Sequence, residues 1–210
     1  MNIQLQNLHI PYIPITTSIV WGQQFEFQFN TSYLIKANSG KGKTTLVNTL
    51  YGLNNNYKGD VLLNQKNYRQ LTPSDWCAIR QKQISIVFQD LKLFLDKTAL
   101  ENIQVKNELT QHISDDTLLH FVKQLSLEHT LHLKVKTLSY GERQRLVIIR
   151  SLLMPFQFLL LDEPFSHLDK TNIEKCVELI THEVQRQQAT IIHFDLENTN
   201  ELNCKHIVQL

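Results

Sequence analysis

The hydrophobic positions form short runs of two kinds, which predict two kinds of β-strand. Residues 25–29, FEFQF, alternate apolar and polar side chains, as a strand with one covered face does. QFLLL (157–161) and TIIHF (190–194) are almost entirely apolar, as strands covered on both faces are. With the remaining runs, the pattern predicts strands at residues 2–8, 25–29, 32–36, 60–63, 84–88, 157–161, 189–193 and 205–209.

Helical patterns fill the intervals between these strands. They predict helices at residues 43–51, 75–82, 98–105, 115–125, 139–153 and 170–187. Gly52 follows the first helix and suits a left-handed helix end. The last helix carries a stripe of core-packing residues, namely Ile173, Val177, Ile180 and Val184. Because strands gather toward both ends and residues 90–153 look wholly helical, we expect a parallel α/β core, an antiparallel flap near the N-terminus and a helical insert.

Composition narrows the class of protein. The 210 residues suit one domain, and the net charge of +1 gives no sign of a nucleic-acid surface. Three scattered cysteines indicate reduced thiols in a cytosolic compartment. The N-terminus lacks the pattern of a secretory signal, and residues 152–161 are too short and too interrupted to span a bilayer. A partner would have to supply any membrane span. The sequence stops at HIVQL, so we expect no C-terminal regulatory domain.

Residues 36–46, KANSGKGKTTL, are typical of a loop that holds phosphate. In the pattern G-x-x-x-x-G-K-[ST], backbone N–H groups surround phosphate oxygens, the lysine reaches the terminal phosphates and the hydroxyl holds Mg²⁺. Gly42, Lys43 and Thr44 match it, a strand precedes the loop and a helix follows. Ala37 replaces the opening glycine. Alanine costs about 1 kcal/mol there if the position needs a positive φ, and fits if it needs only a small side chain.

Two acidic residues follow the apolar run FQFLLL. Asp162 stands where a nucleotide-hydrolysing enzyme with a phosphate loop holds Mg²⁺, and Glu163 stands where a base can polarise water. The plainer alternative is a strand that ends in a polar turn. Upstream, Ser139 and Glu142 in LSYGERQR match S-x-x-E, so Ser139 is expected to cap the helix that begins there.

Taken together, the motifs resemble those of ATP-binding cassette (ABC) ATPases. LSYGE resembles the LSGGQ signature of that family, and further matches follow the family's order over essentially the whole chain. These matches are Gln89 in IVFQD, the segment TALENI (98–103), SHLD (166–169) and His193 in IIHFD.

The resemblance implies an α/β fold of the P-loop NTPase (RecA-like) type. It implies a parallel-sheet core, an N-terminal antiparallel β flap and an inserted all-helical subdomain. Residues 1–210 would form a single ABC ATPase domain. Residues 1–89 and 154–210 would make the ATP-binding core with its flap, and residues 90–153 the helical subdomain with the signature.

The resemblance also implies roles for individual residues. Glu163 would be the general base, Lys43 and His193 would act on the γ-phosphate, and Thr44, Gln89 and Asp162 would hold Mg²⁺. From a second cassette, Ser139 and Gly141 would touch that phosphate, and Asp169 would link the two sites. Tyr12 would stack on adenine, unless it only packs against the flap. The remaining ATP-binding residues would be Asn38, Ser39, Gly40, Lys41, Gly42 and Thr45.

Two departures from the family pattern stand out. Tyr140 replaces the first signature glycine, and Ala37 replaces the loop's first glycine, but neither change removes a catalytic group. We therefore expect an active ATPase with ATP and Mg²⁺. His112, His120, His129 and His132 lack metal-ligand spacing and are expected at the surface or in packing roles.

By resemblance, the chain is the ATPase subunit of a membrane transporter or a related complex. Its partners would be separate transmembrane permease subunits and a second cassette, either a copy or a paralogue, at the cytoplasmic face of the membrane. AIRQKQISIVFQDLKLF and SYGERQR favour the lipoprotein-release, macrolide-efflux and cell-division cassettes, whereas DEPFSHLD favours importers. Two alternatives stay open, a soluble ABC protein that acts on ribosomes or DNA, and a regulator that uses ATP only to dimerise.

Overall fold

The computed structural model describes residues 2–13, 18–38, 40–110, 112–196 and 200–210. Its strands are β1 (Asn2–His9), β2 (Gln24–Gln28), β3 (Ser32–Lys36), β4 (Lys58–Leu63), β5 (Lys66–Asn67), β6 (Ile84–Val87), β7 (Phe158–Asp162), β8 (Thr190–Asp195) and β9 (His206–Gln209). Its α-helices are α1 (Lys43–Leu50), α2 (Pro73–Lys82), α3 (Ala99–Glu108), α4 (Asp115–Gln124), α5 (Tyr140–Leu152) and α6 (Lys170–Gln187).

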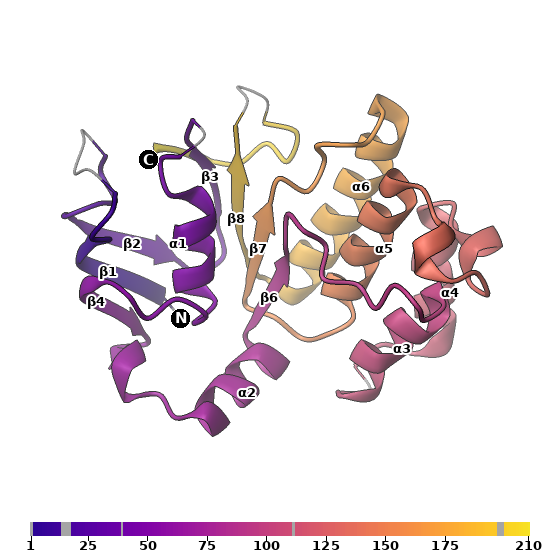
Figure 1. The fold of residues 1–210 in the computed structure, drawn as a ribbon, viewed down its shortest axis with the longest axis horizontal. Coiled ribbons are helices and arrows are strands. Elements are labelled where there is room, and N and C mark those ends of the chain that lie inside the picture. The colour runs from indigo at the N-terminus through magenta and orange to yellow at the C-terminus, as the bar shows by residue number, and fades with distance from the viewer. Residues whose placement is uncertain (1, 14–17, 39, 111, 197–199) are drawn as a thin grey trace.

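In the described ranges the strands form two sheets (Figure 1). The core sheet has the order β6-β7-β8-β3-β9, and every neighbouring pair in it is parallel. The flap sheet has the order β2-β1-β4-β5, and its pairs are antiparallel. The expected parallel core and N-terminal antiparallel flap are therefore confirmed. The short strand β5, which pairs with β4, was not predicted because two residues carry no periodic pattern.

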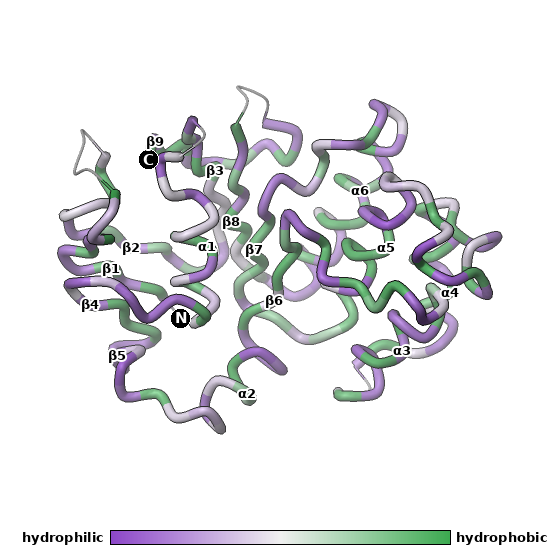
Figure 2. Tube along the Cα trace, in the orientation of Figure 1, coloured by the Kyte–Doolittle hydropathy of each residue, from purple (hydrophilic) through white to green (hydrophobic). Residues whose placement is uncertain are grey.

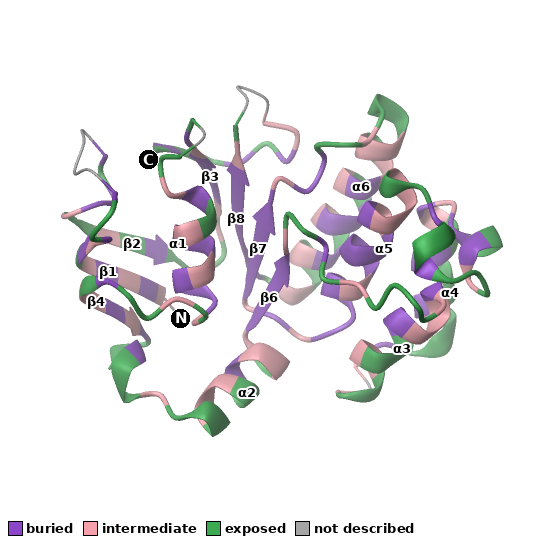
Figure 3. Ribbon diagram, viewed as in Figure 1, coloured by how far each residue is buried: buried purple, intermediate pink, exposed green. Residues whose placement is uncertain are grey.

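The layers follow one another across the molecule. Helix α1 lies between the flap and one face of the core sheet, and α5 and α6 lie on the other side (Figure 1). One apolar cluster joins α1 to the flap through residues such as Leu46 and Leu5, and a second joins α3–α6 to the sheet through residues such as Phe121 and Leu159. The strands β6, β7 and β8 lie almost wholly inside these clusters, where the ribbon is buried and hydrophobic (Figures 2 and 3).

Local sequence signals explain where the helices begin and end. Thr72, Thr98 and Ser139 cap α2, α3 and α5, each in a capping box with the acidic residue three positions later. Helix α1 ends at Leu50 with Tyr51 as its C-cap, and Gly52 follows in the predicted left-handed conformation, with a φ of 72°. The Gly52 and Leu53 N–H groups donate to the Thr49 and Asn48 carbonyls, the hydrogen bonds of a Schellman motif.

The helical region between β6 and β7 shares its core with the sheet. Helices α3, α4 and α5 lie in the same apolar cluster as Val87 of β6 and Leu161 of β7. Within the described ranges, this region adds one isolated bridge between Thr98 and Lys134 to its helices and turns, so its expected helical character is confirmed. Among the described helices, none has the length and apolar character needed to cross a membrane.

Candidate functional site

The loop between β3 and α1 has the backbone geometry that a phosphate-binding loop requires. Gly40 and Gly42 adopt left-handed conformations, with φ of 79° and 95°. A Cβ on Gly42 would lie 2.3 Å from Ile13 Cδ1 and 3.1 Å from the Trp21 ring, so only glycine fits this position. The loop thus delivers the first N–H groups of α1, with their partial positive charge, toward the cavity in front of it.

Ala37 fits the first position of the loop without strain. It does not have a positive φ, and its side chain is buried. Its carbonyl oxygen accepts a hydrogen bond from Lys43 Nζ at 3.4 Å, and its N–H donates to the Asp195 carbonyl at 3.3 Å. Of the two possibilities that the sequence left open, the structure shows the one in which a small side chain suffices.

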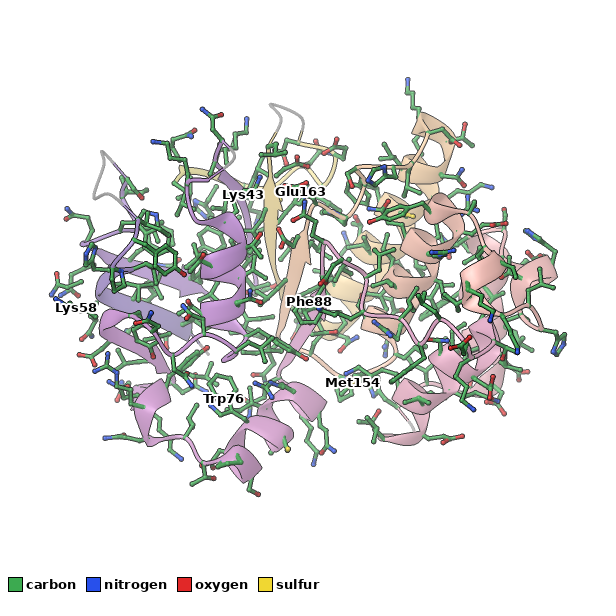
Figure 4. All side chains as sticks on the ribbon, viewed as in Figure 1. Lys43, Lys58, Trp76, Phe88, Met154 and Glu163 are labelled. Atoms are coloured by element: carbon green, nitrogen blue, oxygen red, sulfur yellow. The ribbon has the colours of Figure 1, made fainter. Side chains whose placement is uncertain are left out.

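The loop lysine meets the second acidic residue of the DEP motif. Lys43 Nζ lies 2.8 Å from Glu163 Oε1, with side chains only 7% and 10% exposed, and Figure 4 shows the two residues together at the end of the core strands. Gln89 Nε2 donates to the other oxygen of the same carboxylate at 3.1 Å. Glu163 itself follows β7 with a φ of 49°, a left-handed backbone that turns the chain away from the sheet. The three residues come from three separate segments of the chain.

Asp162 is buried at the end of β7, beside this cluster. Burial, and then the neighbouring Glu163 charge, raise its pKa to about 6, although Lys43 and the Thr44 hydroxyl act in the opposite direction. Its Oδ1 atom is buried and has no hydrogen-bond partner. A buried carboxylate oxygen without a donor is suited to a cation, and together with the Thr44 hydroxyl and the Gln89 side chain it offers the oxygen ligands that Mg²⁺ prefers.

Two adjoining pockets open onto this cluster. The smaller, of about 360 Å³, is lined by the loop residues Asn38, Gly40, Gly42, Lys43, Thr44 and Thr45, together with Tyr12, Ile13, Gln89, Glu163 and Leu196. The larger, of about 720 Å³, also includes Tyr12, Thr44, Thr45 and Gln89, and extends to Asn48, Asn54, Phe88, Lys92, Tyr140 and Asp162. Tyr12 is 64% exposed and borders both pockets, so its ring is accessible to a flat ligand. Of the other expected loop contacts, Lys41 is exposed, and Ser39 lies outside the described residues.

Several pocket residues carried no recognised signal in the sequence. Asn48 lies one turn after Thr44 on α1, and this helical spacing could have identified it. Leu196 and Phe88 offered no such clue, since each follows a strand as an ordinary apolar residue.

His193 does not reach these pockets. It pairs in register with Leu161 of β7 and Leu34 of β3, whereas the next residue, Phe194, pairs with Asp162. Because strand side chains alternate between faces, His193 points to the face of the sheet opposite Asp162. Its side chain is fully buried and lies against the Phe165 ring. This position does not support the expected contact of His193 with the γ-phosphate, and Leu196 of the same segment lines the pocket.

The signature segment lies at the exposed start of α5. Ser139 Oγ accepts a hydrogen bond from the Glu142 N–H at 3.3 Å, and the Glu142 carboxylate accepts one from the Ser139 N–H at 2.8 Å. The Tyr140 hydroxyl donates to the Gln89 carbonyl at 3.3 Å, and its ring packs edge-on against His167. Tyr140 thus ties the signature helix to the Gln89 segment of its own chain.

Gln144 joins the signature helix α5 to the DEP segment that carries Asp162 and Glu163. Gln144 is buried, and its amide donates to the Glu163 carbonyl at 3.1 Å and accepts from the His167 N–H at 3.3 Å. Asp169 lies exposed at the start of α6, where it caps the helix through the Asn172 N–H at 2.9 Å. Ser139 and Asp169 are therefore both open to a second molecule.

Comparison with known proteins identifies the family to which the chain belongs. The family model described as "ABC transporter" matches residues 22–166. The methionine import ATP-binding protein MetN of Protochlamydia amoebophila is 35% identical over 163 residues, which are 76% of this chain and 48% of that protein. The chain thus spans about half the length of this curated relative.

Solved structures share the fold. The cassette MJ0796, solved as a dimer in a post-hydrolysis state with ADP and Pi, has a TM-score of 0.84 at 24% identity, covering 99% of this chain and 94% of that one. A putative ABC transporter ATP-binding protein from Pyrococcus furiosus has a TM-score of 0.79 at 16% identity, covering 100% and 98%. At these identities the likeness establishes the fold, and it confirms the expected P-loop architecture.

Proposed function

The chain belongs to the ABC transporter family, and from this premise we propose that it binds and hydrolyses ATP as the ATPase subunit of a membrane transporter or a related membrane complex. One observation carries the proposal. The glycine-rich loop with its buried Lys43 lies beside two carboxylates, Asp162 and Glu163, at the carboxyl ends of the parallel strands β3 and β7. A phosphate loop alone would support nucleotide binding. The adjacent pair of acids adds groups that can hold a metal ion and accept a proton.

The ion pair between Lys43 and Glu163 suggests how the site changes when nucleotide binds. A terminal phosphate presents several negative oxygens to Lys43 Nζ and competes with the Glu163 carboxylate for it. Glu163, once released, can accept a proton from the attacking water while Gln89 holds its other oxygen. Thr44, Gln89 and Asp162 would hold Mg²⁺, which when bound neutralises charge on the phosphates.

The site would be completed by a second cassette. Ser139, Gly141 and Asp169 lie on the exposed ends of α5 and α6 and would contact the phosphate and the partner across the dimer. A helix N-terminus presents free N–H groups to an anion, which supports a phosphate contact at the start of α5. We propose that ATP holds two cassettes together and that hydrolysis releases them.

The relative named as an import ATP-binding protein supports coupling to membrane subunits. On this proposal the chain acts at the cytoplasmic face of the membrane, with separate permease chains as partners. The alternative is a cassette that uses ATP-dependent dimerisation without transport, and the two proposals differ in whether integral membrane proteins co-purify with the chain.

The decisive experiment compares the wild type with Glu163→Gln, in both phosphate release and ATP-dependent dimerisation. We expect the wild type to release phosphate and the variant to form a stable ATP-bound dimer without turnover, because the amide cannot accept the proton. Glu178→Gln, at an exposed acid of α6, is the matched control and should behave as the wild type. The ATPase proposal fails if the wild type neither releases phosphate nor dimerises with ATP, or if Glu163→Gln turns over normally.

A further inference from the structure

His193 is a buried histidine that the ATP site does not use. Its side chain is fully buried, and neither ring nitrogen forms a hydrogen bond with any part of the chain that the structure describes. A buried polar ring without partners is uncommon, and it points to a water or an ion that completes the site. The groups around His193 indicate whether a water or an ion is expected there.

Two carboxylates face this histidine. Asp195, two residues further along β8, places Oδ2 3.3 Å from His193 Nε2, although the angle is not that of a hydrogen bond. Glu201, on the segment between β8 and β9, contributes an Oε2 atom that is buried and has no hydrogen-bond partner. One ligand atom from each of the three residues lies within 4.8 Å of the other two.

We propose that His193, Asp195 and Glu201 bind a divalent transition-metal ion of the Zn²⁺ type, separate from the Mg²⁺ expected with ATP. One imidazole nitrogen and two carboxylate oxygens are ligands that Zn²⁺ accepts, whereas Mg²⁺ and Ca²⁺ prefer oxygen alone. Metal–ligand bonds of about 2.0–2.1 Å in a tetrahedron set neighbouring ligand atoms about 3.3 Å apart. The distance between His193 Nε2 and Asp195 Oδ2 already has this value, and the Glu201 oxygen, within 4.8 Å of the other two ligand atoms, would move closer to complete the set.

The surrounding hydrogen bonds orient the proposed ligands. The Leu196 N–H donates to Asp195 Oδ1 at 2.6 Å, and Oδ2 of the same carboxylate lies 3.3 Å from His193 Nε2. The Asn200 side chain closes the turn that carries Glu201, accepting from the Cys204 N–H at 2.8 Å and donating to the Cys204 carbonyl at 3.1 Å. Such outer contacts fix ligand geometry in metal sites.

The site adjoins the phosphate pocket through the backbone. Leu196 lines that pocket, and the Asp195 carbonyl accepts the N–H of Ala37, the first residue of the phosphate loop. A metal ion on Asp195 would therefore brace the wall of the nucleotide site from the far face of the sheet. The metal site itself does not depend on ATP hydrolysis.

The test is metal binding by the full chain, depleted of metal and nucleotide and held in excess Mg²⁺. Zn²⁺ is titrated against a chromophoric chelator, and Co²⁺ is followed by its visible absorption. We expect one equivalent to bind, with an absorption spectrum of a low-symmetry nitrogen and oxygen site, and the melting temperature to rise. Because Mg²⁺ is a poor competitor for an imidazole site, the excess should not displace the bound ion.

Variants assign the site. Glu201→Gln changes a partly exposed residue, and we expect it to fold normally and to weaken Zn²⁺ binding at least about tenfold. His193→Gln should remove the nitrogen contribution to the Co²⁺ spectrum. His206→Gln, at an exposed histidine on β9, is the matched control and should bind as the wild type does. The proposal is overturned if no stoichiometric ion binds, if excess Mg²⁺ displaces it, or if a folded Glu201→Gln protein binds with unchanged affinity.

Discussion

Replacing Asp162 with asparagine tests the electrostatics of the carboxylate cluster. In the protein without nucleotide, burial and then the Glu163 charge raise the Asp162 pKa from its ordinary 3.8 to about 6. The folded state therefore holds this proton more tightly than the unfolded state does. The stability that Asp162 contributes is fully present below pH 3.8 and is lost as the pH rises to about 6.

The size of the effect follows from the same values. At about 1.4 kcal/mol per pH unit, the difference between 3.8 and about 6 corresponds to about 3 kcal/mol. Asparagine resembles the protonated acid and avoids this penalty. We expect Asp162→Asn to raise the free energy of unfolding near neutral pH by up to about 3 kcal/mol, and by much less below pH 3.8, where the wild-type acid is protonated in both states.

The assay is urea unfolding of both proteins across this pH range, in buffer without metal or nucleotide. Asp169→Asn is the control, because hydrogen bonds from Asn172 hold the pKa of that exposed carboxylate below its ordinary value, and its neutralisation should give no gain. The reasoning is refuted if Asp162→Asn is no more stable than the wild type near neutral pH, or if its gain is the same at every pH. Mg²⁺ and ATP should stabilise the variant less than the wild type, since a charged metal ligand is lost.

Three further predictions concern the loop, the pocket and the thiols. Ala37→Gly should lower the free energy of unfolding by about 1 kcal/mol and leave ATP affinity within about twofold, because Ala37 has no positive φ and already fits its position. Tighter ATP binding by the variant in calorimetry would contradict this. If the exposed Tyr12 ring stacks on adenine, Tyr12→Ala should weaken ATP binding by about 1 kcal/mol or more, while Tyr12→Phe should keep the wild-type affinity. Equal affinities of all three proteins in a fluorescent-nucleotide titration would assign Tyr12 to packing. A thiol reagent should modify the exposed Cys77 rapidly in the native protein. Cys176 and Cys204 should react only on unfolding, because burial raises the pKa of each thiol to about 12. Rapid modification of a second thiol, detected by mass spectrometry, would disprove this.

The sequence determined the parts of the molecule that depend on short-range physics. Strand and helix positions followed from apolar periodicity, and the capping box at Ser139 and the helix end at Gly52 followed from hydrogen bonds between residues a few positions apart. The loop around Gly42 was recognisable because its backbone needs glycine at a fixed spacing from a lysine. Helix boundaries did not all follow from periodicity, and α2 begins two residues before its predicted start because Thr72 caps it and Pro73 occupies its first position.

Only the tertiary structure shows which side chains and strands from distant parts of the sequence are neighbours. The pairing of Lys43 with Glu163, and the place of β3 between β8 and β9, join segments far apart in the chain, and no local pattern encodes them. His193 is the clearest case. An almost solid apolar strand such as TIIHF has no alternation to reveal which face each side chain takes, so only the register with β7 shows that His193 points away from Asp162.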